Sequence, residues 1–265
     1  MRTVLLPFTG MQSCGAGSQY SERDSQREPH KGHVVGLVCS ALGVARDDKE
    51  MISKVARMRM GVRVDMEPKL AVDFQTSGSG SFPLTLMLGI DKVKPTKYRT
   101  IRAEGSPSSD PSIQRKTFLT DAFFLVALCG EDDLAKRIHE ALGKPVFGLS
   151  LGRKCFKPMI PMKLKDGLVG MNIEQAFKEY PWLPSLIISP FGHGQRPWWI
   201  DRMEREAKKS GVRALIEVSP SEVGRNVRRV FDVPKSFVQE ERTTMIRGAR
   251  HVRMAMIPFP GGAKS

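Results

Sequence analysis

The residues best suited to acid–base chemistry in this sequence are His30 and Lys31, which are adjacent in the segment REPHKGH. An imidazole beside an ammonium group could cleave RNA without a metal. His30 would take the proton of a 2′-hydroxyl, and Lys31 would stabilise the negative charge of the phosphorane. That reaction needs a further acid or base, which the sequence does not identify. The other histidines are scattered, and no GxSxG, HExxH or paired-carboxylate pattern is present.

The same segment starts a predicted helix, and its charges are unusual for that position. Apolar residues recur at helical spacing in VVGLVCSALG, while Pro29 suits a first helical turn and Gly43 suits a C-terminal end. A helix N-terminus carries the positive pole of the dipole and normally attracts Asp or Glu, yet Arg27, His30 and Lys31 gather here. Together with the unpaired N–H groups they would bind a phosphate. The alternative is a solvated charge cluster without a ligand.

Further cations lie in GLSLGRKC at positions 148–155. Its glycines would let the backbone approach a ligand closely, and Arg153, Lys154 and Lys157 would then meet phosphates. The spacing is not GxxxxGK[ST], so nucleotide hydrolysis has no support, and an exposed turn is the alternative. Arginines also alternate with apolar residues after position 225, as on a strand with one wet face. A solvated surface explains any single one of them equally well.

The totals favour a polyanionic partner. The chain has 265 residues and a formal net charge of +14, from 42 Lys and Arg against 28 Asp and Glu. Its 4 cysteines lie far apart without CxxC or Cys/His spacing, so neither a zinc site nor a disulfide framework is predicted, and no cofactor is expected. No run reaches about 18 apolar residues and no signal peptide is recognisable, so we expect a cytoplasmic protein without a membrane partner.

Strand and helix patterns alternate in the first part of the chain. From about 67 to 116 the sequence is rich in Gly, Ser, Pro and cations, which predicts a protruding basic thumb. The order of the other elements predicts an α+β fold, with a ferredoxin-like (RRM-like) βαββαβ domain at 1–157 and a smaller, partly β domain at 158–265. The RNP1 consensus is absent, so stacking of bases on sheet aromatics is not expected. The predicted strands are 3–8, 61–65, 118–129, 146–151, 186–189, 213–218 and 250–257, and the predicted helices are 31–43, 48–59, 132–142, 172–180 and 199–209.

Six segments, taken in order, resemble the blocks of a known family, the CasD subunit of the type I-E CRISPR Cascade complex. They are GMQSCG (10–15), REPHKGHVVGLVCSALGVARDD (27–48), DFQTS (73–77), QRKTFLTDAFFLVAL (114–128), GLSLGRKCFKPMIP (148–161) and FDVPKSF (231–237). Two departures are local. The family usually has Trp where Cys14 stands, and Thr or Ser flanking the helix lysine, where His30 and Gly32 stand.

The resemblance implies a repeat-associated RNA-binding protein with a ferredoxin-like core, a thumb that kinks the guide RNA and a smaller C-terminal domain. Members of that family hold the 5′ handle of the guide RNA (crRNA) and cap one end of the complex. They contact the CasC backbone subunit and the large CasA subunit, and they meet target DNA through the assembled complex. The RNA-binding residues that we predict on this basis are Gln12, Arg27, His30, Lys31, Arg46, Lys94, Lys97, Arg99, Arg115, Arg153, Lys154 and Lys157.

Two functions stay open. The first is a non-catalytic RNA-binding subunit without a metal or a catalytic residue. The alternative is a metal-independent endoribonuclease that processes CRISPR repeat RNA, since relatives in the type I-C branch cleave it. The RDD-type block and the long thumb resemble the type I-E branch, which favours the non-catalytic subunit.

Overall fold

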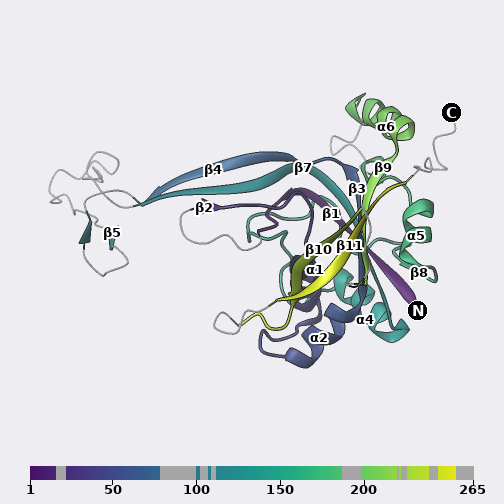
Figure 1. The fold of residues 1–265 in the computed structure, drawn as a ribbon, viewed down its shortest axis with the longest axis horizontal. Coiled ribbons are helices and arrows are strands. Elements are labelled where there is room, and N and C mark those ends of the chain that lie inside the picture. The colour runs from purple at the N-terminus through teal and green to yellow at the C-terminus, as the bar shows by residue number, and fades with distance from the viewer. Residues whose placement is uncertain are drawn as a thin grey trace.

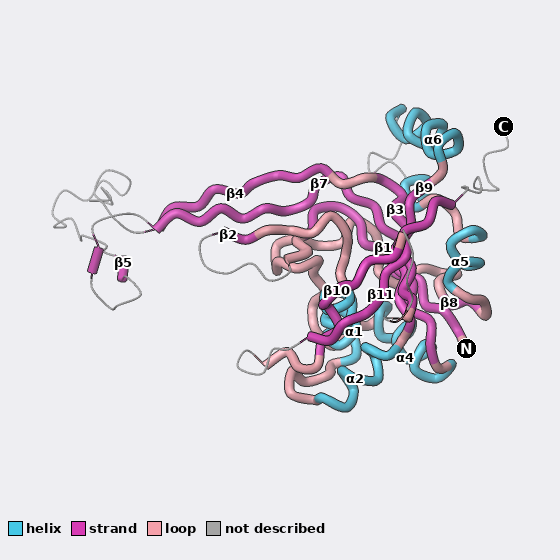
Figure 2. Tube along the Cα trace, viewed as in Figure 1, coloured by secondary structure: helices cyan, strands magenta, loops and turns pink. Residues whose placement is uncertain are grey.

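A computed structural model describes residues 1–15, 22–77, 100–101, 107–108, 112–186, 198–219, 221, 226–238 and 244–254. Within these ranges the chain is a mixed α/β protein built on one nine-stranded, mainly antiparallel sheet, with a separate strand pair β5–β6 (Figures 1 and 2). The sheet order is β10-β11-β9-β3-β7-β1-β8, and β2 and β4 also pair with β7.

The strands are β1 (Arg2–Gln12), β2 (Glu22–Arg23), β3 (Arg59–Met66), β4 (Lys69–Ser77), β5 (Thr100–Ile101), β6 (Pro107–Ser108), β7 (Ser112–Gly130), β8 (Leu168–Val169), β9 (Val212–Val218), β10 (Val227–Pro234) and β11 (Thr244–Met254). The helices are α1 (Lys31–Leu42), α2 (Lys49–Arg57), α4 (Asp132–Gly143), α5 (Ile173–Glu179) and α6 (Trp198–Ser210), with a short 3-10 helix η1 (Leu183–Leu186).

Both faces of the central sheet are covered. Along β1, Val4, Leu6 and Phe8 pack into one core with α1, α2 and α4, which lie together on one side of the sheet (Figure 1). Leu5 points the other way, into a second core with α5, η1 and α6. Because successive side chains of a strand point to opposite faces, a strand between two cores must be apolar at every position, as VLLPF is.

The predicted helices starting near 31, 48 and 132 are confirmed, as are those near 172 and 199. Local signals place their ends. The Asp48 carboxylate accepts from the N–H of Met51 at 2.9 Å and so caps α2, and Gly43 ends α1 with φ 74°.

The predicted thumb contains a long strand pair. β4 and the first part of β7 pair in register from Lys69 opposite Thr120 to Ser77 opposite Ser112. This pair, which we call the ribbon, extends away from the helices and the rest of the sheet (Figure 1). Residues 78–99 lie outside the described part of the chain.

The predicted strand at 146–151 is wrong. The N–H groups of Val146 and Phe147 donate instead to the carbonyls of Ala41 and Ser40, at 3.0 and 3.2 Å, which completes the C-terminal end of α1. A helix end leaves carbonyls without partners inside the helix, and this segment supplies donors for them. On the side of β1 away from β7, the neighbouring strand is β8, which comes later in the chain and pairs with Thr3 and Val4.

Strand β10 was not predicted, whereas the strand near 213 is confirmed as β9 and the last strand forms as β11, which starts before the predicted position. Of the predicted strand at 186–189, position 186 lies in η1 and the rest lies outside the described residues. β9 pairs with β3, so the strands after position 158 extend the same sheet as the N-terminal part. Within the described residues no helix is both long and apolar enough to cross a membrane.

Candidate nucleic-acid interface

A carboxylate already occupies the N-terminus of α1. Asp232, on β10, accepts the backbone N–H of Lys31 at 2.8 Å and is held by two hydrogen bonds of 2.7 Å from Arg247 on β11. Burial alone would raise the pKa of Asp232, but the Arg247 guanidinium and the Lys31 N–H hold it below the usual value. The positive end of the helix therefore holds a carboxylate of the protein itself, in the position where the sequence predicted a phosphate.

The Lys31 side chain points into the protein. Its Nζ lies 2.7 Å from both carboxylate oxygens of Glu217 on β9, and the residue is only 1% exposed. Burial lowers the pKa of Lys31, although Glu217 opposes this effect. A direct phosphate contact from Lys31, which the charge pattern predicted, does not fit this arrangement because the ammonium is buried and paired.

The His30 ring uses both of its nitrogens. Nδ1 accepts the N–H of His33 at 3.2 Å, which caps α1, and Nε2 lies 2.9 Å from the carbonyl oxygen of Gly15. A neutral imidazole with its proton on Nε2 satisfies both contacts. Burial lowers the pKa of His30, which keeps the ring in this neutral form.

The predicted ligand Gln12 is fully buried at the end of β1. Its Oε1 lies 3.9 Å from the thiol of Cys14, and that sulfur lies 3.5 Å from Nδ1 of His33. Cys14 is itself buried, and it joins the end of β1 to α1.

The segment 148–157, which we call the glycine loop, packs against the end of β1. The N–H of Ser13 donates to the carbonyl of Leu151 at 2.9 Å. Gly152 has φ +93°, and a Cβ there would lie 2.0 Å from the Ser13 carbonyl oxygen. Only glycine fits this position, since both the backbone conformation and the close approach exclude a side chain.

Arg153 joins the glycine loop to the ribbon. Its guanidinium carbon lies 5.5 Å from the ring centre of Phe118 and 5.3 Å from that of Phe156. It also donates to Asp73 at 3.4 Å and to the carbonyl of Thr117 at 3.3 Å. With 22% of its side chain exposed, Arg153 mainly positions the loop.

The other predicted ligands are exposed or undescribed. Lys154 and Lys157 are exposed on the glycine loop, and Arg115 is exposed on β7, opposite Phe74 of β4. The two lysines thus lie on the loop that Arg153 joins to the ribbon, whereas Arg115 lies in the outer half of the ribbon. Arg27 is exposed before α1, and Arg46 is exposed between α1 and α2. Lys94, Lys97 and Arg99 lie outside the described residues.

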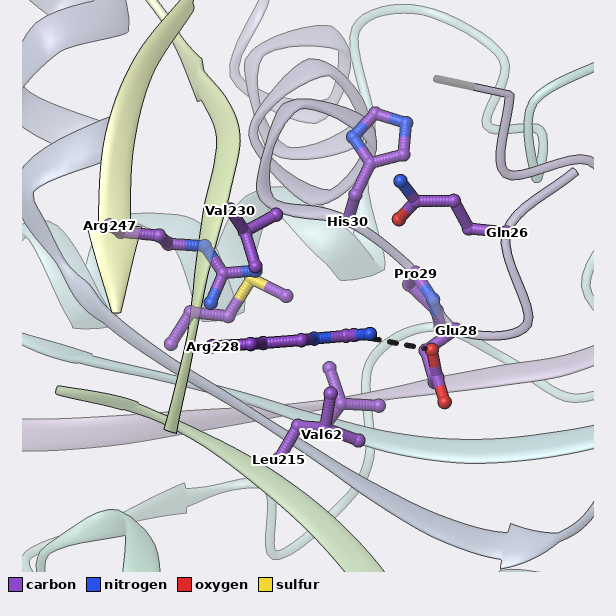
Figure 3. Close-up of a pocket in the computed structure, with 10 residues that line it drawn as sticks. Gln26, Glu28, Pro29, His30, Val62, Leu215, Arg228, Val230 and Arg247 are labelled. Carbon is purple, nitrogen blue, oxygen red and sulfur yellow. Dashed lines mark ion pairs between the residues drawn. The ribbon is translucent and has the colours of Figure 1, made fainter. Parts of the chain in front are cut away.

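A narrow cleft lies between the segment before α1 and strands β10 and β11 (Figure 3). Val62 and Leu215 line its apolar side, and Arg228, Arg247 and His30 line its polar side. The sequence reasoning assigned no role to Arg228. The alternating pattern of HVRMAM predicted the strand at 250–257, but no strand was predicted at Arg228.

The described residues contain no group of three or more His, Cys, Asp or Glu that could hold a metal ion. All four cysteines are free thiols, and Cys155 is the exposed one.

Fold and site together define an α/β protein built on a nine-stranded sheet, with a projecting ribbon and exposed cations on the ribbon and on the glycine loop joined to it. The sequence model of the family described as CRISPR-associated protein (Cas_Cas5) matches residues 3–253, so the chain belongs to this family. This confirms the resemblance found in the sequence blocks.

Two solved structures are similar over almost the whole chain. One is described as "Crystal structure of Cas protein", with 30% identity, 97% of each chain covered and a TM-score of 0.64. The other is a chain of a "CRISPR RNA-guided surveillance complex", with 24% identity, 96% of this chain and 90% of that chain covered, and a TM-score of 0.67. A search of curated protein sequences finds no significant match.

Proposed function

We propose that this protein is a non-catalytic guide-RNA-binding subunit of a type I-E Cascade complex, where it holds the 5′ handle of the crRNA and caps the backbone. Its protein partners are then the CasC backbone subunit and the large CasA subunit, and it meets target DNA only within the complex. Family membership supports this proposal, and so does the similarity to a chain of a surveillance complex.

The observation that carries the RNA-binding role is the pair of exposed lysines on the glycine loop, which Arg153 joins to the ribbon. Lys154 and Lys157 are exposed on this loop, and Arg115 is exposed farther out on the ribbon. The loop that carries the two lysines is fixed by Gly152 and Arg153, so the charges are held in place before RNA arrives. Preorganised cations at a projecting ribbon suit a phosphate backbone, which supplies most of the affinity in such complexes.

We further infer a ferredoxin-like core. The strand order β8-β1-β7-β3, with α1 and α4 packed on the same side, supports this assignment. Ordinary RNA-recognition domains bind RNA on an open sheet face, whereas here a second layer of α5, η1 and α6 covers that face. The RNA would therefore run along the loops and the ribbon.

The geometry at His30 supports a non-catalytic role. Both ring nitrogens are engaged, and the neighbouring Lys31 is buried against Glu217, so neither group is free to act on a 2′-hydroxyl. The endoribonuclease alternative can be tested with purified protein, repeat RNA and a chelator on a denaturing gel. Intact RNA supports the proposal. Cleavage that His30→Ala abolishes would establish the enzyme instead.

The first experiment on the function is affinity purification from the native host, followed by sequencing of bound RNA and identification of bound proteins. Guides that share one 5′ end, recovered with the other Cascade subunits, are the expected result. Heterogeneous fragments, or no RNA, would refute handle binding.

The site can be tested by the dependence of RNA affinity on salt. Lys154→Gln should flatten the slope of log K against log salt by about 0.7 for single-stranded RNA, because one phosphate contact is lost. Lys178→Gln is the control, since Lys178 is also exposed but lies on α5, on the opposite side of the sheet. Equal slopes for Lys154→Gln and the wild type would remove Lys154 from the interface.

A further inference from the structure

We propose that the cleft beside α1 is a second anchor for the RNA backbone, and that Arg228 is its phosphate ligand. This inference rests on the proposed RNA-binding function. It adds a site on strands β9 to β11, where no RNA contact is otherwise assigned.

Three of the arginines on strands β9 to β11 differ in their pairing, namely Arg213, Arg228 and Arg247. Arg247 makes two hydrogen bonds of 2.7 Å to Asp232. Arg213 donates twice to Glu67, at 2.8 and 2.9 Å, and also to Glu28. Both guanidinium groups are therefore committed to carboxylates inside the protein.

Arg228 is paired much more weakly. Within the described residues it forms an ion pair with Glu28 at 3.6 Å, which is too long for a hydrogen bond, and 48% of its side chain is exposed. A guanidinium group has five N–H donors that match two phosphate oxygens at once. Arg228 thus keeps most of its donors available at the mouth of the cleft.

The cleft orients the Arg228 side chain. Figure 3 shows it extended across the cleft towards Glu28, with Val62 and Leu215 to one side. Apolar contacts along the stem restrict its rotamers, so less conformational entropy is lost when an anion binds. Gln26, in the lining, adds an amide donor near the same opening.

The local charges allow a phosphate to replace the Glu28 contact. Glu28 would repel a phosphate, but it also accepts from Arg213, which it shares with Glu67, so part of its charge is offset without Arg228. Arg27 adds an exposed cation next to the cleft. The positive potential also lowers the pKa of nearby His251, where burial is the larger cause and the charge of Arg228 the next.

The cleft is connected to the cations at the ribbon by a short path of backbone contacts. Leu151 in the glycine loop bonds to Ser13, and the next residue, Cys14, accepts the N–H of Gln26 at 2.9 Å. The two basic surfaces therefore lie on either side of the same short stretch of chain. A single RNA strand that leaves the glycine loop would reach Arg228 along it.

A carboxylate of a partner protein could also bind a free guanidinium. We favour RNA because the chain carries a net charge of +14 and because the exposed Arg27 stands in the chain between Gln26 and Glu28, which line the cleft. Repeated cations along a path suit a polymer of phosphates better than one carboxylate.

The test compares full-length variants in binding a fluorescein-labelled, single-stranded RNA copy of the host's CRISPR repeat over a range of salt concentrations. Arg228→Gln should flatten the salt slope by about 0.7, and Arg228→Lys should keep the slope but weaken binding several-fold. Arg229→Gln is the matched control, because this neighbour is also exposed on β10 but points to the opposite face. Thermal unfolding checks that each variant is folded. If Arg228→Gln does not fold, Arg228→Lys replaces it in the test, because it keeps the charge and the aliphatic stem.

The outcomes separate this inference from the proposed function. A flattened slope for Lys154→Gln but not for Arg228→Gln overturns the second anchor and leaves the RNA-binding role intact. Equal flattening by Arg228→Gln and Arg229→Gln would show an effect of net charge only, which also overturns it. An Arg228→Gln variant that binds RNA normally but no longer joins the complex would assign the cleft to a protein carboxylate. If the wild type itself does not bind the RNA, the proposed function fails first.

Discussion

Lys31 and Glu217 form a salt bridge that joins the first turn of α1 to strand β9, with Nζ 2.7 Å from both carboxylate oxygens. Glu217 also accepts the N–H of Met60 on β3 at 2.8 Å. The lysine that looks most like an RNA ligand in the sequence therefore holds a helix against two strands.

Lys31→Met should destabilise the protein by about 3 kcal/mol or more, because it leaves Glu217 largely buried without its cation. Urea unfolding measures this loss. The control is Lys54→Met, which removes an exposed pair with Glu50 and should cost only about 0.5 kcal/mol. If Lys31→Met were as stable as the wild type and instead flattened the salt slope of RNA binding, Lys31 would be a phosphate ligand after all.

Arg63→Met should cost about 3–5 kcal/mol, since it leaves the carboxylate of Asp65 in the core without a cation. Arg63 donates to Asp65 at 2.6 and 2.8 Å and also to the backbone carbonyls that lead into η1. Hydrogen exchange should therefore rise first at 177–186. Arg59→Met is the control, because its pair with Glu174 is more than a third exposed on both sides. Similar stabilities for the two variants would contradict a central role for Arg63.

Gly152→Ala should destabilise the junction of the glycine loop with β1, because the added Cβ would meet the Ser13 carbonyl oxygen at 2.0 Å. We expect a lower melting temperature and weaker RNA binding, since Lys154 is displaced with the loop. Gly148→Ala lies in the same loop, and no atom lies within 4 Å of its added Cβ, so it should change neither property. If the two substitutions had equal effects, the close contact at Gly152 would not be their cause, and the loop would respond only to the loss of backbone flexibility at a glycine.

The stability of the protein should fall as the pH drops below about 6.5. Burial, and to a smaller extent the charge of His30, lowers the pKa of His33 from 6.5 to about 3. Between these values the unfolded chain binds a proton that the folded protein excludes, so His33 alone reduces the free energy of unfolding by about 1.4 kcal/mol per pH unit.

His33→Phe removes this titrating group. In urea titrations at pH 4.5 to 6.5, the free energy of unfolding should then depend less steeply on pH, by about 1.4 kcal/mol per pH unit. The aromatic contact with Phe8 can be kept by the new ring. His251→Gln serves as the control, because His251 is less deeply buried. An unchanged pH slope in His33→Phe would mean that His33 takes up a proton in the folded state.

Much of the fold could be predicted from local patterns. The helices at 31 and 132 and the long strand ending near 129 follow from periodicity, capping residues and apolar runs, which act over a few residues. The prediction of a strand at 146–151 was wrong because the contacts that decide its structure are not local. Its residues have strand propensity, but their N–H groups complete the end of α1, a partner about a hundred residues away that no local pattern reveals.

The candidate site also has a part that the sequence predicts and a part that it does not. The sequence alone determined the family, the excess of positive charge and the groups of cations before α1 and in the glycine loop. Only the tertiary structure decided which of these cations are free. Asp232 reaches the start of α1 across 201 positions and Glu217 reaches Lys31 across 186, so both cancel charges that look exposed in the sequence. Arg228 keeps most of its donors because Glu28, its ion-pair partner, is hydrogen-bonded to Arg213 instead. Charge is a property of each residue, but its availability depends on neighbours that only folding brings together.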